Sequence, residues 1–191
     1  MSKTNELYPI FLKVHQLNVL IIGGGKVALE KVSFLLKSSP NAQLQLVAPE
    51  IREEVRQLAE KYKIDLIEKA YDSYDIQEKD LVIAATDKEE INLQVYKDCK
   101  ANNVLINVAD TPEYCDFYLG GIVTKGNVKI AISTNGKSPT TAKRLRQFFE
   151  EVIPNDINEL VENLNQYRKT IKGNFEKKVV TLNKLTESLV K

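Results

Sequence analysis

The sequence predicts an α/β protein built on a doubly wound parallel sheet, and three observations point to this class. Short runs of consecutive apolar residues alternate with stretches whose apolar residues recur at helical spacing. A glycine-rich turn joins the first apolar run to the first helical stretch. The runs are apolar throughout, which is typical of parallel strands covered on both faces. A small α+β segment and a helical C-terminal part are expected to follow.

The first two strands and helices are each predicted by their pattern of apolar residues. Residues 18–22 are mostly apolar and β-branched, which predicts a buried strand. The stretch 27–36 has apolar residues three and four positions apart, which predicts an amphipathic helix. By the same criteria we expect a second strand over 44–47 and a second helix over 51–62.

The remaining elements of this first domain continue the alternation. Buried strands are expected over 64–67, 81–85 and 104–108, and a helix through residues 91–99 joins the last two. Five parallel strands separated by crossovers complete the predicted sheet.

The pattern changes after Pro112. Strand-like runs over 117–123 and 128–133 are joined by residues 124–127, a connection that suits a hairpin better than a crossover.

Helices are expected for the rest of the chain. Ser138 and Pro139 have the form of an N-cap followed by proline at the first helical position, and Pro154 ends this helix. Leucine and valine then recur at helical spacing with a break at Gly173, which predicts two more helices.

The composition is that of an ordinary water-soluble protein. The 191 residues include 27 Lys and Arg against 26 Asp and Glu, so the net charge of +1 indicates no nucleic-acid or membrane partner. One histidine and two cysteines are too few for a conventional metal cage or a disulfide framework. No signal peptide and no apolar run of about 20 residues is found. We therefore expect a cytoplasmic protein without a metal.

The glycine-rich turn has the spacing of a dinucleotide-binding fingerprint of the Rossmann type. Gly23-x-Gly25-x-x-Ala28 follows a strand and opens a helix, which is the context that this motif requires. Glycine permits the tight turn and lets the backbone approach a pyrophosphate at the helix N-terminus. The alternative is a tight turn without a ligand. The binding interpretation assigns cofactor contacts to Gly23, Gly24 and Gly25.

The end of the second strand bears on the choice between NAD and NADP. An acidic residue there binds the ribose 2′-hydroxyl of NAD, and Glu50 lies about where that acid is expected. Arg52 lies close enough in sequence to bind the 2′-phosphate of NADP instead. We expect NAD, and an NADP-linked reductase acting on a small substrate remains the alternative.

Thr86 and Asp87 close the fourth strand. They would border the same crevice at the carboxyl edge of the sheet. As bare residues they could equally cap the next helix.

A carboxylate also stands just beyond the fifth strand. In Asn107-Val108-Ala109-Asp110, the aspartate would lie at the ligand-binding edge, where it could act as a general acid or base. The alternative is that Asp110 closes an Asx-type turn before Pro112.

The stretch between Asp116 and Glu150 contains no acidic residue. Its six cations are Lys125, Lys129, Lys137, Lys143, Arg144 and Arg146. This charge could bind a polyanionic substrate, or it could form an ordinary solvated surface. No pattern of aromatic residues accompanies the cations, so nucleic acid is not expected.

The histidine and the two cysteines are given no catalytic role. Cys99 is expected in the core on the apolar face of its helix, Cys115 in an exposed turn, and His15 on the surface.

Four motifs together resemble those of one enzyme family. They are the segments 8–12, 19–28, 107–110 and 131–139, and they occur in this order. From about Tyr8 to Pro154 the chain resembles the precorrin-2 dehydrogenase family, also known as the siroheme synthase N-terminal family.

This resemblance implies a homodimer that oxidises precorrin-2, a small-molecule tetrapyrrole, to sirohydrochlorin and reduces NAD⁺. It implies a Rossmann NAD-binding domain over 1–113, a dimerisation and substrate-binding segment over 114–153, and a helical region over 154–191. Precorrin-2 is ringed with carboxylates, which gives the basic segment a suitable partner.

The resemblance also implies roles for individual residues. Asp110 matches the family's aspartate that is tied to catalysis, and Ser133 and Thr134 match a hydroxyl-bearing loop near the substrate. Contacts to the cofactor are expected from Lys26, Val27, Pro49, Glu50, Thr86 and Asp87. Contacts to the substrate are expected from Ser133, Thr134, Lys137, Lys143, Arg144 and Arg146.

Two other functions remain open at this point. Some members of the family also insert iron into sirohydrochlorin, and the sequence does not decide whether this chain is bifunctional. In a different class, a regulatory module could bind NAD without catalysing a reaction.

Overall fold

The structure is a computed structural model in which residues 4–187 are described. Residues 1–3 and 188–191, at the two ends of the expected first and last regions, lie outside the described residues. The chain groups into two units. The first unit extends to Leu119 and also includes Ser133–Lys137; the second consists of Gly120–Ile132 and the chain from Ser138 onward.

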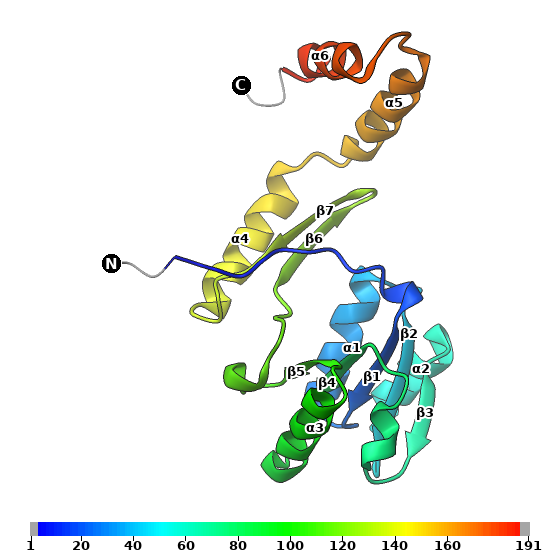
Figure 1. Ribbon diagram of the computed structural model, residues 1–191, viewed down its shortest axis with the longest axis vertical. Helices are drawn as coiled ribbons and strands as arrows, with labels where there is room; N and C mark the ends of the chain where they lie inside the picture. Colours follow the sequence, from blue (N-terminus) through cyan, green and yellow to red (C-terminus); the bar gives the residue numbers. More distant parts are fainter. Residues whose placement is uncertain (1–3, 188–191) are drawn as a thin grey trace. The chain divides into compact units, whose positions relative to one another are not determined.

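A parallel sheet of five strands forms the centre of the first unit (Figure 1). The strands are β1 (Asn18–Ile22), β2 (Gln43–Ala48), β3 (Asp65–Glu68), β4 (Leu81–Ala84) and β5 (Leu105–Val108). Their order in the sheet is β3-β2-β1-β4-β5, and every pairing is parallel. This order confirms the doubly wound prediction. The topological switch point lies at the carboxyl ends of the neighbouring strands β1 and β4.

Each face of the sheet has its own apolar core, because alternate residues of a strand point to opposite faces. Helices α1 (Lys26–Ser38) and α2 (Glu53–Tyr62) pack against the face that includes Val19 and Ile21. Helix α3 (Glu89–Ala101) and the 3-10 helix η2 (Ser73–Ile76) pack against the opposite face, which includes Leu20 and Ile22. Both faces are therefore buried, which explains the uniformly apolar strands.

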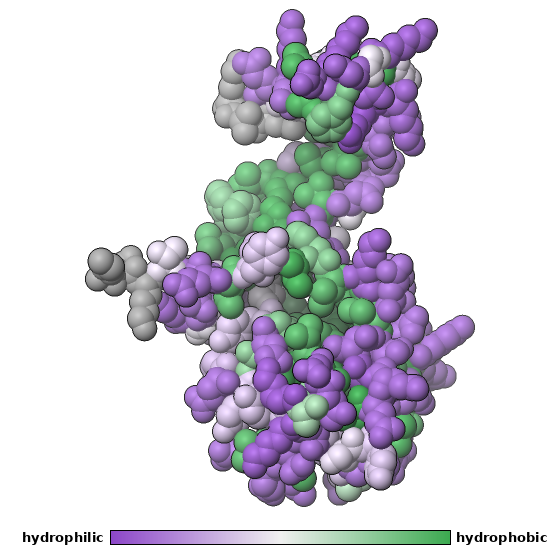
Figure 2. All heavy atoms as spheres, in the orientation of Figure 1, coloured by the Kyte–Doolittle hydropathy of each residue, from purple (hydrophilic) through white to green (hydrophobic). Residues whose placement is uncertain are grey.

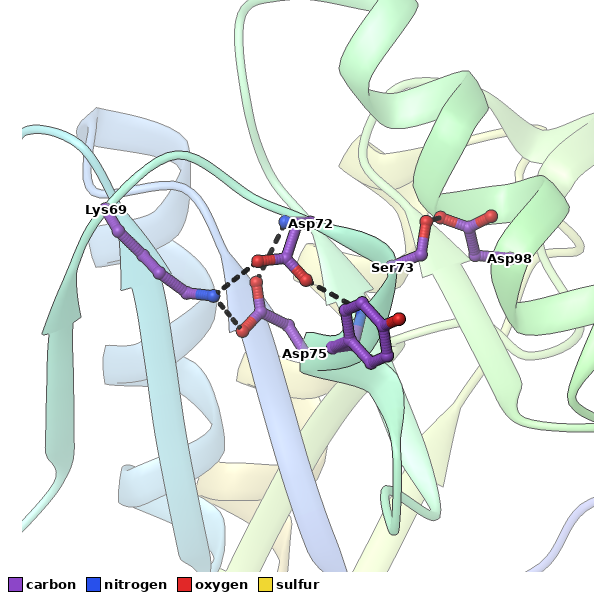
Figure 3. Close-up of polar contacts among 6 residues, drawn as sticks. Lys69, Asp72, Ser73, Asp75 and Asp98 are labelled. Atoms are coloured by element: carbon purple, nitrogen blue, oxygen red, sulfur yellow. Dashed lines mark hydrogen bonds and ion pairs between the residues drawn. The ribbon is translucent and has the colours of Figure 1, made fainter.

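The crossover from β3 to β4 contains the short helix η2 in place of a long one. Lys69 forms ion pairs with Asp72 and Asp75 (Figure 3). Its Nζ lies 2.8 Å from Asp72 Oδ2 and 2.7 Å from Asp75 Oδ1. Ser73 donates a hydrogen bond of 2.8 Å to Asp98 on α3 (Figure 3). The Lys69 ammonium lowers the pKa of the Asp72 carboxyl through its hydrogen bond. Polar contacts thus fix this crossover to α3, beside the single buried apolar residue of η2, Ile76.

Helix α2 begins two residues later than the expected 51–62. Ile51 is buried in the core against α1 and α2, and Arg52 has an extended backbone with φ −61° and ψ 147°. The chain that leaves β2 is still extended at Arg52, so the helix begins only at Glu53. Apolar spacing alone included Ile51 because its side chain is buried like those of the helix.

A hairpin opens the second unit. It consists of β6 (Gly121–Lys125) and β7 (Val128–Ile132), joined by the two residues Gly126 and Asn127. The expected first strand over 117–123 was therefore set too early, and residues 124–125 belong to the strand. Phe117 and Leu119 instead pack against the core of the first unit, which explains their apolar character.

Three helices follow the hairpin, as predicted: α4 (Pro139–Val152), α5 (Ile157–Thr170) and α6 (Phe175–Leu185). Ser138 caps α4 through its Oγ, which accepts from the Thr141 N–H at 3.2 Å. Asn158 on α5 accepts hydrogen bonds of 2.8 and 2.9 Å from the backbone N–H and the side-chain amide of Asn127. The turn of the hairpin is thereby fixed to α5.

Helix α4 exposes large apolar side chains. Leu145, Phe148 and Val152 are 39%, 54% and 58% exposed, and Figure 2 shows apolar atoms gathered over this helix. In residues 4–187 no helix is long and apolar enough to cross a membrane.

Candidate functional site

Most of the expected cofactor residues gather at one edge of the parallel sheet. The carboxyl ends of β1, β2, β4 and β5 lead into Gly23, Pro49, Ala85 and Ala109, respectively. Because all of these strands are parallel, their carboxyl ends meet at the same edge, where doubly wound folds bind their ligands. The glycine turn, Glu50, Thr86 and Asp110 are therefore brought to one side of the first unit.

The three glycines of the turn meet different surroundings. Gly23 has a φ of +120°, and a Cβ there would lie 2.4 Å from the Ala85 carbonyl oxygen. A Cβ on Gly24 would lie 2.1 Å from the carbonyl oxygen of Glu50. A Cβ on Gly25 would have no atom within 4 Å. The first two glycines allow close backbone packing, and the third faces open space where a ligand can approach.

The N-terminus of α1 is suited to bind an anion. Gly25 is its N-cap and provides no side-chain hydrogen bond, and the first turn holds no acidic residue. The N–H groups at the start of a helix lack intrahelical partners and carry the positive end of the helix dipole. Lys26 and Val27 open this turn, so their backbone groups are suited to a pyrophosphate.

The loop after β2 is fixed directly against the glycine turn. The Arg52 N–H donates a hydrogen bond of 3.0 Å to the Gly24 carbonyl oxygen. Pro49 and Glu50, in the same loop, are both exposed. This loop therefore lies where the adenosine ribose of a dinucleotide is bound in such folds.

Arg52 is engaged by a neighbour that sequence reasoning missed. Its Nη2 lies 2.8 Å from Glu54 Oε1, and its Nε lies 3.3 Å from Oε2. The hydrogen bond to Arg52 lowers the pKa of the Glu54 carboxyl, so Glu54 is ionised at neutral pH. The spacing Arg-x-Glu in the sequence was the available signal.

The end of β4 is organised around Asn92, a buried residue of α3 that the sequence reasoning also missed. Thr86 Oγ1 donates to Asn92 Oδ1 at 2.8 Å, and Asn92 Nδ2 donates to the Thr86 carbonyl at 3.0 Å. The N-cap of α3 is Lys88 without a side-chain cap, so neither Thr86 nor Asp87 caps this helix. Asp87 is exposed.

Asp110 lies directly beyond β5 and is exposed. Its backbone has a φ of +60°, a left-handed conformation that residues with a Cβ rarely adopt. Within residues 4–187 its carboxylate has no hydrogen-bond or ion-pair partner. An Asx turn would need the N–H of residue 112, which is a proline, so that alternative is excluded. The carboxylate is available to a ligand.

The expected hydroxyl-bearing loop is a tight turn that groups with the first unit. Ser133 Oγ accepts a hydrogen bond of 3.1 Å from the Asn135 N–H, and the Lys137 N–H donates to the Thr134 carbonyl at 3.1 Å. Lys137 is exposed.

The other cations of the basic segment belong to the second unit and differ in their environments. Lys143 and Arg144 are exposed on α4, and Arg144 donates a hydrogen bond of 3.0 Å to Gln147. Arg146 is half-buried and pairs with Glu150. Glu150 lies just beyond the stretch without acidic residues, so the charge pattern of that stretch does not reveal the pairing. Arg146 carries less uncompensated charge than the other two.

The two cysteines and the histidine are placed as follows. Cys99 is fully buried and His15 is exposed, as predicted. Cys115 was expected in an exposed turn but is half-buried, because its sulfur is enclosed by backbone groups of the chain around Asp110. In the part of the chain that is described, no cluster of three or more His, Cys, Asp or Glu could hold a metal ion.

The fold and this edge of the sheet define a dinucleotide-binding domain of the Rossmann type. Residues 10–121 match a family model described as NAD(P)-binding, and residues 125–151 match the model described as sirohaem biosynthesis protein central. The chain belongs to the siroheme synthase N-terminal family.

Individual relatives agree with this assignment. A siroheme synthase of Pseudoalteromonas atlantica is 36% identical over 170 residues, which are 89% of this chain and 36% of the relative. One from a Psychrobacter species is 40% identical over 166 residues, which are 87% of this chain and 34% of the relative. The chain thus spans about a third of the length of these relatives.

A solved structure shares the fold. The protein named "SirC, precorrin-2 dehydrogenase" superposes with a TM-score of 0.77, covering 94% of this chain and 89% of that one. The sequence identity is 21%.

Proposed function

We propose that this chain is an NAD-dependent dehydrogenase that oxidises precorrin-2 to sirohydrochlorin, with Asp110 as the general acid/base. The observation that carries the proposal is the exposed, unpaired carboxylate of Asp110 at the same sheet edge as an open dinucleotide turn. Membership in the siroheme synthase N-terminal family supplies the substrate class. A protein that only senses NAD would not need a carboxylate there.

The chain's residues would divide the work between binding and proton transfer. The N–H groups that open α1 hold the pyrophosphate, and the loop of Glu50 binds the adenosine ribose. When bound there, NAD⁺ would supply the hydride acceptor for the oxidation of a ring carbon of precorrin-2. Asp110 takes up the proton that this oxidation releases, directly or through one water. The products are sirohydrochlorin, NADH and one proton, so electrons and protons balance.

The pairing of Arg52 with Glu54 supports NAD over NADP as the cofactor. A 2′-phosphate would have to compete with the Glu54 carboxylate for the Arg52 guanidinium, and it would be repelled by that carboxylate. Glu50 remains available to the free 2′-hydroxyl of NAD.

The substrate is bound, in this proposal, through its ring of acetate and propionate carboxylates. Lys137, Lys143 and Arg144 are exposed cations suited to pair with carboxylates, and Arg146 would contribute less because Glu150 compensates its charge. Ser133 and Thr134 would add hydroxyl groups.

We further propose that the protein acts as a homodimer, with residues 114–153 providing the contact. The support is the set of exposed apolar side chains on α4, of which Phe148 is 54% exposed. Such side chains are commonly covered by a partner. Light scattering on the wild type and on Phe148→Glu tests this: a dimer should become a monomer.

The decisive experiment mixes purified, metal-free protein with NAD⁺ and anaerobically prepared precorrin-2. NADH absorbance and the visible spectrum of sirohydrochlorin are followed together, with Asp110→Ala in parallel. Both signals should rise in the wild type only. Binding of NAD⁺ without either signal would contradict the proposal and favour a regulatory module that senses NAD.

A further inference from the structure

The sulfur of Cys115 lies inside the turn that carries Asp110. It lies 3.2 Å from the Val108 carbonyl oxygen and 3.4 Å from that of Thr111, so its S–H can donate to either. It also accepts from the Val108 N–H at 3.3 Å. Residues on both sides of Asp110 are therefore joined through one thiol.

Asn107 closes the same turn from the strand. It is buried, with 6% of its surface exposed, and donates a hydrogen bond of 2.8 Å to the Phe117 carbonyl. The same amide lies 3.4 Å from the Cys115 sulfur. Asn107 thus ties the chain that enters the turn to the chain that leaves it.

Contacts with two neighbouring elements, β5 and α3, fix the returning chain. Asp116 accepts from the Ile106 N–H at 3.1 Å through its carboxylate, and its own N–H donates to the Ile106 carbonyl at 2.8 Å. The ring of Tyr114 stacks on that of Tyr96 on α3, with centroids 4.6 Å apart. The base of the turn is therefore attached to β5 and α3, and among the described residues the Asp110 carboxylate has no hydrogen-bond or ion-pair partner.

We infer that Cys115 and Asn107 are positioning residues that hold Asp110 in its left-handed conformation and aim its carboxylate at the substrate. The inference rests on the proposed function of Asp110. Aspartate tolerates a left-handed backbone better than most residues with a Cβ, but this conformation is still less favourable than the right-handed one, so the surrounding contacts help to maintain it. The turn around Asp110 is closed by the Thr111 N–H, which donates to the Val108 carbonyl at 3.3 Å, and the thiol and the buried amide reinforce it. The Asp110 side chain itself makes no such contact among the described residues.

The state of the thiol fits this role. Burial raises the pKa of the Cys115 thiol, so the group keeps its proton at neutral pH and can donate to the carbonyl groups. A thiolate would instead face two carbonyl oxygens. Cys115 therefore acts through hydrogen bonds and not as a nucleophile.

The test compares Cys115→Ala and Cys115→Ser, with Cys99→Ala as the matched control. Cys99 is a fully buried thiol on α3, and it shares no hydrogen bond with the described residues of the Asp110 turn. We expect Cys115→Ala to lower kcat by roughly 10- to 100-fold with little change in the Kd of NAD⁺. Cys115→Ser should recover most of kcat, because serine keeps a donor and an acceptor. Cys99→Ala should lower the Tm without a comparable loss of kcat.

A double-mutant cycle separates positioning from general structural damage. In an Asp110→Asn background, Cys115→Ala should cause little further loss of the residual single-turnover rate. An equal loss in both backgrounds would overturn the inference, as would a kcat for Cys115→Ala equal to that of the wild type.

Hydrogen exchange makes the test independent of the proposed reaction. Cys115→Ala should accelerate exchange of the Val108 and Thr111 amides, while that of the β1 amides stays unchanged. Unchanged protection would refute the inference even if the enzyme is active. Accelerated exchange in a protein that fails to oxidise precorrin-2 would contradict the proposed function and leave Cys115 and Asn107 only as supports of the turn.

Discussion

The side chains of Arg52 and Glu54 form a two-point ion pair at the start of α2, with N–O distances of 2.8 and 3.3 Å. The Arg52 backbone is fixed by its hydrogen bond to the Gly24 carbonyl, so the pair stands beside the dinucleotide turn. Arg52 is the cation nearest in sequence to Glu50, where the ribose is expected to bind. Its charge is already paired with the Glu54 carboxylate.

Replacing Glu54 should weaken discrimination against NADP. In Glu54→Gln the Arg52 guanidinium becomes available to a 2′-phosphate, and the repelling carboxylate is removed. We expect the affinity for NADP⁺ to rise by about fivefold, as is usual for an exposed ion pair, with the affinity for NAD⁺ unchanged. Titration of both nucleotides against protein fluorescence or by calorimetry measures this.

The matched control is Glu53→Gln, which removes the same charge one residue away. Glu53 accepts a hydrogen bond from Gln57 and none from Arg52. An equal gain in NADP⁺ affinity for both variants would mean that only the overall charge matters.

Replacing Asp110 should abolish most of the chemistry and spare cofactor binding. Asp110→Asn keeps the shape of the side chain and its tolerance of the left-handed backbone, but removes the base. We expect kcat to fall by about 10²- to 10⁴-fold, with the Kd of NAD⁺ unchanged. Glu113→Gln, an exposed acid three residues further along, should leave both values unchanged. A fully active Asp110→Asn would remove the residue from the mechanism.

The second and third glycines of the turn should differ when each is replaced by alanine. In Gly24→Ala the new methyl group would meet the Glu50 carbonyl, so we expect a loss of about 1–3 kcal/mol in stability and a lower Tm. In Gly25→Ala the methyl group meets no protein atom, so the Tm should be unchanged while the affinity for NAD⁺ falls. Thermal melts with and without NAD⁺ report both effects. Equal melting behaviour of the two variants would contradict the assignment of Gly25 to the phosphate.

Removing the Asn92 side chain should loosen the end of β4. Asn92→Leu leaves the Thr86 N–H and carbonyl without their side-chain partners, at a cost of about 1–3 kcal/mol in the free energy of unfolding. The affinity for NAD⁺ should fall as well, because this loop borders the switch point. Urea denaturation checks the stability. Gln94→Leu changes an exposed amide of the same helix and should have a much smaller effect.

The sequence predicted the sheet and its helices well because these elements are defined by local apolar patterns. The strand from 18 to 22, the helix that begins at Pro139 and the break at Gly173 all carry strong local signals. Phe117 and Leu119 were misassigned to a strand because their burial comes from contacts with a distant core, which periodicity does not register.

The candidate site could be predicted from the sequence only where its residues belong to a recognisable motif. The glycine turn and Asp110 stand at strand ends, so spacing alone brought them to one edge. Glu54, Asn92 and Cys115 act through hydrogen bonds to nearby side chains or backbone, and an isolated Asn or Cys in a sequence does not show its partner. Such contacts depend on the course of the loops, which the apolar pattern leaves undetermined.

The grouping of Ser133–Lys137 with the first unit has a consequence for the gene that encodes this protein. A fragment that stops at Leu119 would omit this segment, and the shortest reading frame that contains the whole first unit has to run through β6 and β7 to Lys137. Recombination or truncation between the two units therefore has no clean breakpoint. No single cut in the chain can therefore release the whole first unit without β6 and β7.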